Sequence, residues 1–231
     1  MPIFSLSEEL TFPPAYLATA EGLIAVGGDL KPERLLLAYR NGIFPWYSQG
    51  DPILWWSPDP RMILRPDELT VTKSLRKTIN TRRFEVSMDH SFEQVIDLCA
   101  RVRTDKGQET WLTNDMIEAY VRLHRLGYAH SVEVWHHGKL CGGLYGLSLG
   151  RCFFGESMFS RERDASKVAL YHLSSHLKSY HFDFIDCQVP SDHLKRLGAV
   201  AVSRKYFLIK LNQSLQYPHL VGAWTAALQG D

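Results

Sequence analysis

Residues 181–189, HFDFIDCQV, carry more information about the fold than any other stretch of this 231-residue chain. Their alternating pattern is typical of a buried strand, in which side chains i and i+2 lie on one face. That period places Asp186 and Gln188 on the face of two phenylalanines, so a carboxylate and an amide continue an apolar row. Burying an ionised carboxylate is costly unless a partner compensates it. We therefore expect either a functional site at this strand end or polar groups that satisfy a neighbouring loop.

The segments on both sides of this strand predict an alternation of helices and strands. Apolar spacing and the stop signal Gly127 indicate the helices, and short apolar runs between turns indicate the strands. The expected elements are helices from Ser91, from about Asn114, at 165–180 and at 191–197, and strands at 131–135, 140–147, 151–159 and 200–211. The order is two helices, three strands, then helix, strand, helix and strand.

This order resembles the acyl-CoA-dependent N-acetyltransferase (GNAT) fold, an α+β fold with a mixed sheet. Proteins of that fold bind the cofactor pyrophosphate on backbone N–H groups of a glycine-rich turn before a helix. The corresponding turn here, residues 157–167, contains no glycine. This turn therefore counts against an acyl-CoA donor, although the scaffold could serve acylation of an amine by another donor.

The amino-acid composition of the chain changes near residue 90, which predicts more than one structural unit. Residues 29–42 read as a short helix, with Pro32 in its first turn and Gly42 at its end. An aromatic region follows and leads to a strand near residues 62–64. We expect a small N-terminal α+β domain at 1–65, a basic connecting segment at 66–90 and a GNAT-like transferase domain at 91–231.

The composition indicates a folded globular protein, because 45% of the residues are hydrophobic and the formal net charge is only +1. Such a charge provides no global attraction to nucleic acid or membrane, so a polyanion would need a local patch. Four scattered cysteines and the absence of a leader or a long apolar run favour a cytoplasmic protein without a membrane segment. The histidines lack a metal-ligand spacing, so no metal is expected.

Glu156 is the second carboxylate in an apolar strand. Strand parity places it on one face with Phe154 and Met158. If its strand and that of Asp186 flank one gap, Glu156, Asp186 and Gln188 form an acidic pocket that suits a cationic amine. The alternative is an ion pair between Glu156 and a basic residue at the start of the next helix.

Two further groups are candidates for RNA binding. The basic side chains near residues 73–83 could follow phosphates, or they could be a solvated helix face. The basic candidates are Lys73, Arg76, Lys77, Arg82 and Arg83, with a smaller group of Arg161, Arg163 and Lys167 beside the expected pocket. The tryptophans, including Trp46 and Trp111, could stack bases or belong to the core.

Several ordered motifs together resemble the bacterial leucyl/phenylalanyl-tRNA–protein transferases. The motifs are residues 27–30 (GGDL), 39–46 (YRNGIFPW), 54–61 (LWWSPDPR), 155–160 (GESMFS) and 185–189 (IDCQV). The resemblance implies a cytoplasmic aminoacyltransferase that moves Leu or Phe, and less readily Met, from aminoacyl-tRNA to the N-terminal Arg or Lys of a protein, creating a degradation signal. It implies neither a metal nor a cofactor, and we expect a monomer.

The resemblance also implies roles for individual residues. The donor aminoacyl group and its adenosine would be bound by Trp46, Trp111, Phe153, Gly155, Ser157, Met158 and Leu173. Leu173 stands where relatives carry an aromatic residue. Glu156, Asp186 and Gln188 would form the catalytic and acceptor site, and the basic run at 73–83 would bind tRNA.

Two mechanisms remain open at this point. Asp186 could take the proton of the attacking amine, directly or through Gln188 and water, while backbone N–H groups at 155–157 stabilise the oxyanion. Alternatively, Asp186 and Glu156 could bind the basic acceptor side chain while the departing ribose oxygen takes the proton. Rival functions are an aminoacyl-tRNA-dependent cell-wall peptide transferase and a non-catalytic RNA- or peptide-binding module.

Overall fold

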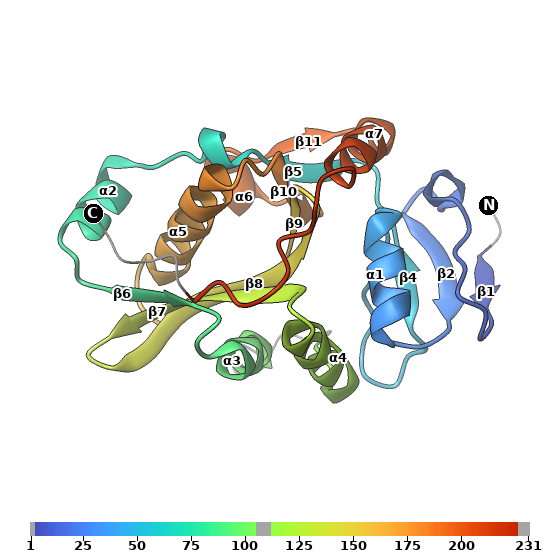
Figure 1. Ribbon diagram of the computed structural model, residues 1–231, viewed down its shortest axis with the longest axis horizontal. Helices are drawn as coiled ribbons and strands as arrows, with labels where there is room; N and C mark the ends of the chain where they lie inside the picture. Colours follow the sequence, from blue (N-terminus) through green and yellow to red (C-terminus); the bar gives the residue numbers. More distant parts are fainter. Residues whose placement is uncertain (1–2, 105–111, 226–231) are drawn as a thin grey trace.

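The protein has an α+β fold with two sheets, as the computed structural model shows for residues 3–104 and 112–225 (Figure 1). The smaller sheet has the order β1-β2-β4-β3, and the larger one has the order β11-β5-β10-β9-β8-β7-β6. The strands of the smaller sheet are β1 (Phe4–Leu6), β2 (Leu23–Gly27), β3 (Phe44–Pro45) and β4 (Leu54–Trp56). Those of the larger sheet are β5 (Arg61–Leu64), β6 (Glu85–Met88), β7 (Ala129–His136), β8 (Lys139–Leu149), β9 (Cys152–Ser160), β10 (Phe184–Gln188) and β11 (Val200–Val202).

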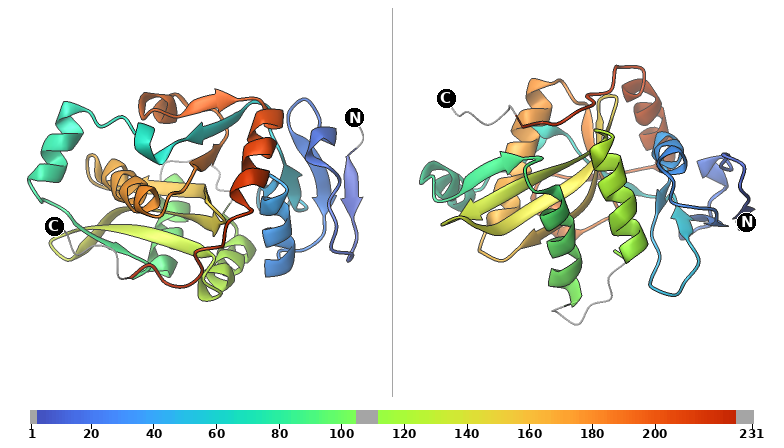
Figure 2. Two further views of the ribbon diagram at one scale, coloured as in Figure 1. Left: turned by 45° about the horizontal axis from the view of Figure 1, so that its top comes forward. Right: turned by 60° about the horizontal axis from the view of Figure 1, so that its bottom comes forward.

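Helices cover both faces of the larger sheet. The described helices of the chain are α1 (Pro32–Arg40), which packs on β3 of the smaller sheet, α2 (Lys73–Asn80), α3 (Phe92–Thr104), α4 (Asn114–Arg125), α5 (Ala165–Ser179), α6 (Asp192–Arg196) and α7 (Arg204–Ser214). Two short 3-10 turns, Ala15–Leu17 and Pro66–Glu68, complete the described elements. The helix α5 packs on one face of β7, β8 and β9, while α3 and α4 lie on the other face (Figures 1 and 2). Each face therefore has its own apolar core.

The central part of the larger sheet combines antiparallel and parallel pairing. The strands β7, β8 and β9 form the predicted antiparallel meander, and β10 pairs with β9 in parallel. A parallel pair needs a crossover connection, and α5 supplies it. The predicted helices from Asn114, at 165–180 and at 191–197 are confirmed, with bounds that differ by a few residues at most.

The predicted strand at 200–211 is wrong for most of its length. Only Val200–Val202 forms a strand, and α7 begins at Arg204. The side chain of Ser203 accepts a hydrogen bond from the backbone N–H of Tyr206 at 3.3 Å, which is the geometry of a helix N-cap. This cap is a local signal that outweighs the strand-like apolar pattern of the residues after it.

The strand expected near residues 62–64 is present as β5, but it does not belong to the smaller sheet. It pairs with β10 and β11 in the larger sheet. The stretch before it crosses from one sheet to the other. The division into units at 1–65, 66–90 and 91–231 stays a proposal, and its first unit includes β5, a strand of the larger sheet. None of the described helices is long and apolar enough to span a membrane.

Candidate functional site

A cavity of about 360 Å³ opens where β9 and β10 part. The two strands pair only through residues 152–154 and 184–186, so their later residues leave room between them. The described lining residues are Phe44, Pro45, Trp46, Leu144, Tyr145, Phe153, Gly155, Glu156, Ser157, Met158, Leu170, Leu173, Ile185, Cys187, Gln188, Val189, Ser191, His193 and Leu194. Most of them are apolar, and Glu156 and Gln188 supply polar groups. Such a combination is typical of a small-molecule site.

A β-bulge at Glu156 brings its side chain into this cavity. Across the ladder, Tyr145 faces Ser157 while the next residue of β8, Gly146, faces Gly155, so Glu156 is the extra residue. The predicted parity, with Phe154, Glu156 and Met158 on one face, is therefore wrong. Met158 lies on the α5 face with Phe153, while Phe154 faces the opposite core.

Three side chains from distant parts of the chain donate hydrogen bonds to the Glu156 carboxylate. Tyr39 Oη on α1 donates to Oε1 at 2.7 Å, and Tyr120 Oη on α4 donates to Oε2 at 3.0 Å. Gln188 Nε2 also donates to Oε1, at 2.8 Å. The two tyrosine oxygens also lie within hydrogen-bonding distance of each other, although the single proton of each hydroxyl is already directed to Glu156. The predicted alternative, an ion pair between Glu156 and a basic residue at the start of α5, is not formed among the described residues.

The environment of Glu156 holds it near the midpoint of its titration at neutral pH. Burial raises the pKa of Glu156 to about 7, although the hydrogen bonds from Tyr39 and Tyr120 act in the opposite direction. Burial, together with the nearby carboxylate, raises the pKa of both tyrosines well above their usual value. Both phenols are therefore protonated donors, and Glu156 is the group here that can exchange a proton near pH 7.

Asp186 lies beneath the site, on the opposite face of β10. Its side chain is fully buried and forms a bidentate ion pair with Arg61, in which Nε donates to Oδ1 at 2.8 Å and Nη2 to Oδ2 at 2.5 Å. The guanidinium lies between the rings of Phe44 and Phe207 and also donates to the carbonyl of Gly42. Asp186 is not among the described residues that line the cavity. The buried carboxylate therefore has the specific partner that its position in the sequence requires.

Gln188 leaves the regular pattern of β10. Its φ of 62° is left-handed, and the register of β10 against β5 shifts between Asp186 and Gln188. The backbone N–H of Gln188 donates to Asp186 Oδ1 at 2.9 Å. As a result Gln188 reaches the cavity while Asp186 faces away, so the prediction that both lie on one face is wrong. The other face of β10, which carries Ile185 and Cys187, lines the cavity.

The predicted donor residues meet at the apolar part of the cavity. Phe153, Met158 and Leu173 line it, with Gly155 and Ser157 beside Glu156. Trp46 lies at the rim with 44% of its surface exposed, and its ring is 6.0 Å from that of Trp56. Trp111 lies outside the described residues.

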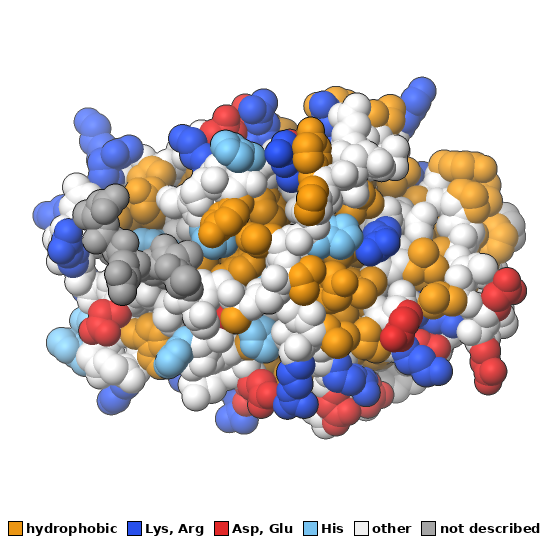
Figure 3. Space-filling view, in the orientation of Figure 1, with side chains coloured by type: hydrophobic (Ala, Val, Ile, Leu, Met, Phe, Trp, Pro, Cys, Tyr) orange, Lys and Arg blue, Asp and Glu red, His pale blue; other side chains and the backbone are white. Residues whose placement is uncertain are grey.

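The predicted tRNA-binding side chains lie away from the cavity. All five are exposed, on α2 or in the turn after it. Figure 3 shows lysine and arginine side chains gathering at this end of the molecule. Arg83 forms an ion pair with Glu162 at 2.5 Å, which connects this patch to the turn before α5. Near that turn, the charges of Lys167 and Arg196, added to burial, lower the pKa of His193 at the cavity rim.

Reasoning from the sequence missed three functional candidates: Tyr39, Tyr120 and Arg61. Tyr39 and Arg61 belong to motifs that were recognised, but no local pattern indicated their partners. Tyr120 reads as part of the apolar stripe of α4, and only the fold shows that its hydroxyl reaches a carboxylate. No group of His, Cys, Asp and Glu in the described ranges is arranged to hold a metal ion.

Comparison with known proteins gives one consistent family. A family model described as leucyl/phenylalanyl-tRNA protein transferase matches residues 63–212, and a model of the N-terminal domain of the same proteins matches residues 28–59. A leucyl/phenylalanyl-tRNA–protein transferase of Desulforapulum autotrophicum is 55% identical over 97% of this chain and 98% of its own length. One of Syntrophobacter fumaroxidans is 57% identical over 93% of this chain and 92% of its own length.

Solved structures with some similarity include two acetyltransferases. An aminoglycoside acetyltransferase from a soil metagenomic sample is 11% identical, with a TM-score of 0.39 over 50% of this chain and 84% of its own. A GCN5-related N-acetyltransferase from Kribbella flavida is 9% identical, with a TM-score of 0.39 over 78% of this chain and 63% of its own.

Proposed function

This chain belongs to the leucyl/phenylalanyl-tRNA–protein transferase family, as its motifs predicted, and we propose that its cavity is where the aminoacyl group passes to the acceptor. The protein is an aminoacyltransferase that moves Leu or Phe from aminoacyl-tRNA to proteins. Its acceptors in this proposal are proteins with an N-terminal Arg or Lys in the cytoplasm, Met is a poorer donor, and the added residue marks the acceptor for degradation. The enzyme acts as a monomer.

The apolar part of the cavity holds the donor side chain. Phe153, Leu170 and Leu173 form a wall without a polar side chain, which suits Leu or Phe. Discrimination by such a wall is graded, because one methylene in a pocket is worth only roughly 1–3 kcal/mol. Trp46 at the rim supplies a flat surface for the terminal adenosine.

The polar part of the cavity holds the reacting amine. The acceptor nitrogen forms a bond with the ester carbonyl carbon, the bond from that carbon to the ribose oxygen breaks, and the proton that the amine loses passes to the departing ribose oxygen, directly or by way of Glu156. Glu156, together with Gln188, lies at this position and takes that proton or holds the amine. Gln188 Nε2 is directed to Glu156, so its Oε1 accepts from the amine. The N–H groups at the bulge of residues 155–157 stabilise the oxyanion, because a bulged residue is left out of the ladder.

Asp186 acts in this proposal as a positioning residue. Both of its oxygens accept hydrogen bonds from Arg61, and Oδ1 also accepts from the backbone of Gln188. An ion pair of this kind fixes the left-handed turn that brings Gln188 into the cavity. The observation that carries the whole proposal is the Glu156 carboxylate, held by Tyr39, Tyr120 and Gln188 beside an apolar wall.

Transfer to defined peptides tests the function. Phe-tRNA is incubated with peptides that begin with Arg, Lys or Ala, and mass spectrometry follows the addition of one Phe. We expect addition to the Arg and Lys peptides, abolished when RNase is added first. Addition to a lipid-linked muropeptide in place of the peptides would support the cell-wall alternative, and binding of Phe-tRNA without transfer would support the non-catalytic one.

The patch around α2 binds the body of tRNA through its phosphates. Charge reversal with Arg76→Glu and Lys77→Glu is expected to raise the KM for Phe-tRNA and to weaken its salt dependence. It leaves the KM for an aminoacyl-adenosine donor unchanged, because that donor does not reach α2. The matched control reverses Arg122 and Arg125 on α4, which are exposed on another helix. Equal losses with both donors would refute the patch.

A further inference from the structure

We propose that Trp224 sets the depth of the donor pocket by supporting Phe153 from behind, and so determines which side chains the enzyme transfers. Trp224 lies near the end of the C-terminal strap, which we define as residues 215–225. The inference rests on the proposed function, because it takes the apolar part of the cavity as the place of the donor side chain.

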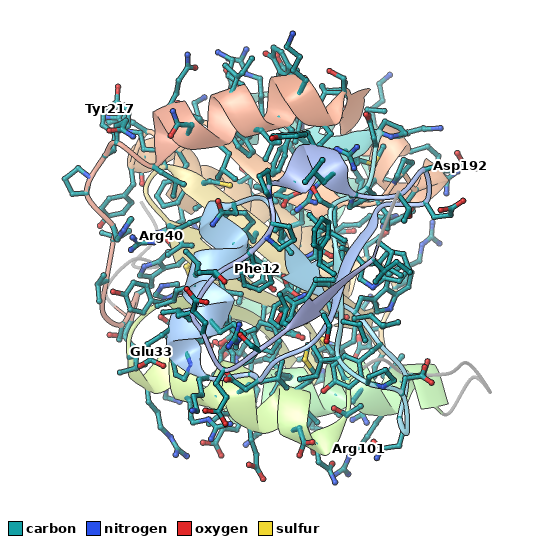
Figure 4. The ribbon with its side chains drawn as sticks, turned by 90° about the vertical axis from the view of Figure 1, so that its right-hand side faces the viewer. Phe12, Glu33, Arg40, Arg101, Asp192 and Tyr217 are labelled. Atoms are coloured by element: carbon teal, nitrogen blue, oxygen red, sulfur yellow. The ribbon has the colours of Figure 1, made fainter. Side chains whose placement is uncertain are left out.

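The strap is fastened to several elements along its length. The ring of Tyr217 lies 3.5 Å from the guanidinium carbon of Arg151, and His219 accepts from the backbone N–H of Gly150 at 2.7 Å. Nε2 of the same imidazole lies 3.1 Å from Nη2 of Arg40 in α1. Figure 4 shows Arg40 and Tyr217 on the same side of the molecule, where the strap descends past α1.

The side chain of Trp224, near the end of the strap, is buried in the core between α5 and the larger sheet. Only 5% of its surface is exposed, and its backbone N–H donates to Asp89 Oδ2 at 2.8 Å. The indole stacks on the ring of His130 with 3.8 Å between centroids and an interplanar angle of 6°. His130 is held in turn by Asp89 at 2.8 Å. Two interactions therefore fix the position of the indole: the backbone hydrogen bond to Asp89 and the stacking of the ring on His130.

The indole contacts the ring that forms the wall of the donor pocket. The centroids of Trp224 and Phe153 are 5.9 Å apart, and Phe153 is fully buried while it lines the cavity. The ring of Trp224 also contacts that of His176. His176 lies one helical turn after Leu173, which is another residue of the pocket wall. The pocket thus has an apolar first layer, and Trp224 fills the space behind it.

Polar nitrogen atoms lie among the groups behind the wall. Within the described part of the chain, His130 Nε2, His176 Nε2 and Trp224 Nε1 are buried without a hydrogen-bond partner. A smaller residue at position 224 would leave a space into which Phe153 can turn, and imidazole nitrogens would border it. The pocket would then be deeper, and its far end would accept a hydrogen-bonding group. Donors with a larger ring and a polar tip should gain most from this change.

The test compares donors within each variant. Transfer of Phe, Tyr and Trp from their adenosine esters to an Arg-initiated peptide is measured for the wild type, Trp224→Leu and Trp224→Phe, below the melting temperature of each. In Trp224→Leu the ratios of kcat/KM for Tyr and Trp to that for Phe should rise by about tenfold or more, because one methylene in a pocket changes discrimination by roughly 10–200-fold. Trp224→Phe should give a smaller rise in the same direction.

A purely structural role would lower transfer of all three donors together and leave the ratios unchanged. The matched control is His219→Ala, which loosens the strap without removing a contact of Phe153. Ratios within about twofold of wild type in both Trp224 variants, or an equal change in His219→Ala, would overturn the inference. If Trp224→Leu does not fold, Trp224→Phe decides alone. A wild type that fails to transfer Phe at all would instead contradict the proposed function.

Discussion

Asp186→Asn should weaken the fold much more than it slows transfer. Asp186 and Arg61 are both fully buried, and the carboxylate accepts two hydrogen bonds from the guanidinium. Removing one partner of a buried pair costs about 3–5 kcal/mol, because the other charge is left uncompensated. One kcal/mol shifts the melting temperature of a domain of this size by about 2–4 °C. The expected fall is therefore about 6–20 °C for Asp186→Asn, and similar for Arg61→Met.

The double variant Arg61→Met, Asp186→Leu separates stability from positioning. The guanidinium lies between Phe44 and Phe207, so apolar side chains suit its place, and replacing a buried pair by apolar residues is often neutral or stabilising. We expect its melting temperature to return to within a few degrees of wild type. Transfer should stay reduced, because the backbone N–H of Gln188 has lost its acceptor.

Thermal unfolding followed by circular dichroism measures the first effect, and kcat with saturating Arg-initiated peptide measures the second. A positioning residue predicts less than about a tenfold loss of kcat in Asp186→Asn below its melting temperature, whereas loss of a general base costs about 10²–10⁴-fold. The control is Arg65→Met with Asp67→Asn, an exposed pair at 3.3 Å, which should change stability by less than about 1 kcal/mol. A wild-type melting temperature combined with a loss above 100-fold would show that Asp186 takes part in the chemistry.

Three further predictions concern Glu156 and the glycines beside it. The pKa of Glu156 is raised from 4.5 to about 7, so the folded state holds this proton more tightly than the unfolded state does. Relative to Glu156→Gln, the free energy of unfolding of the wild type should be unaffected below pH 4.5, fall by about 3 kcal/mol as the pH rises to 7, and stay level above pH 7. Denaturant unfolding of both proteins across this pH range measures the difference. Tyr120→Phe removes a donor that lowers this pKa, so the midpoint of the pH profile of kcat/KM should move to higher pH, and an unchanged midpoint would count against Glu156 as the titrating group. Gly146→Ala should prevent folding, because the added Cβ would lie 2.1 Å from the carbonyl oxygen of Phe154. Gly155→Ala, opposite it in the ladder, should fold, because its Cβ would lie 3.6 Å from the nearest atoms. The yield of soluble protein and the melting temperature of each variant test both expectations.

Local signals in the sequence predicted most helices and the meander. The apolar stripe of α4 and the stop at Gly127 depend on neighbouring residues only, and so does the helix that follows residue 164. The prediction of a strand at 200–211 was wrong because Ser203 caps a helix whose apolar residues also fit the pattern of a strand. The family motifs indicated the transferase, and the family comparison confirms it.

The parity arguments at the site failed because each strand is interrupted where the site lies. A period of two holds only in an unbroken ladder, and both Glu156 and Gln188 leave it. Gly155 was an available signal for the bulge, since an isolated glycine in a strand often marks one. The partner of Asp186 had no local signal, because Arg61 is 125 residues away in the chain. The carboxylate was recognised as unusual, but its partner could come only from the fold.

The hydrogen bonds around Glu156 also set the order in which this part of the fold can form during synthesis. They join residues separated by 117, 36 and 32 positions, so the site cannot assemble until residue 188 has left the ribosome and β10 has paired. Contacts of such long range form slowly, because loop closure must precede them. A nascent chain that has already produced the whole of α1 and β9 therefore still lacks the hydrogen bond from Gln188 to Glu156.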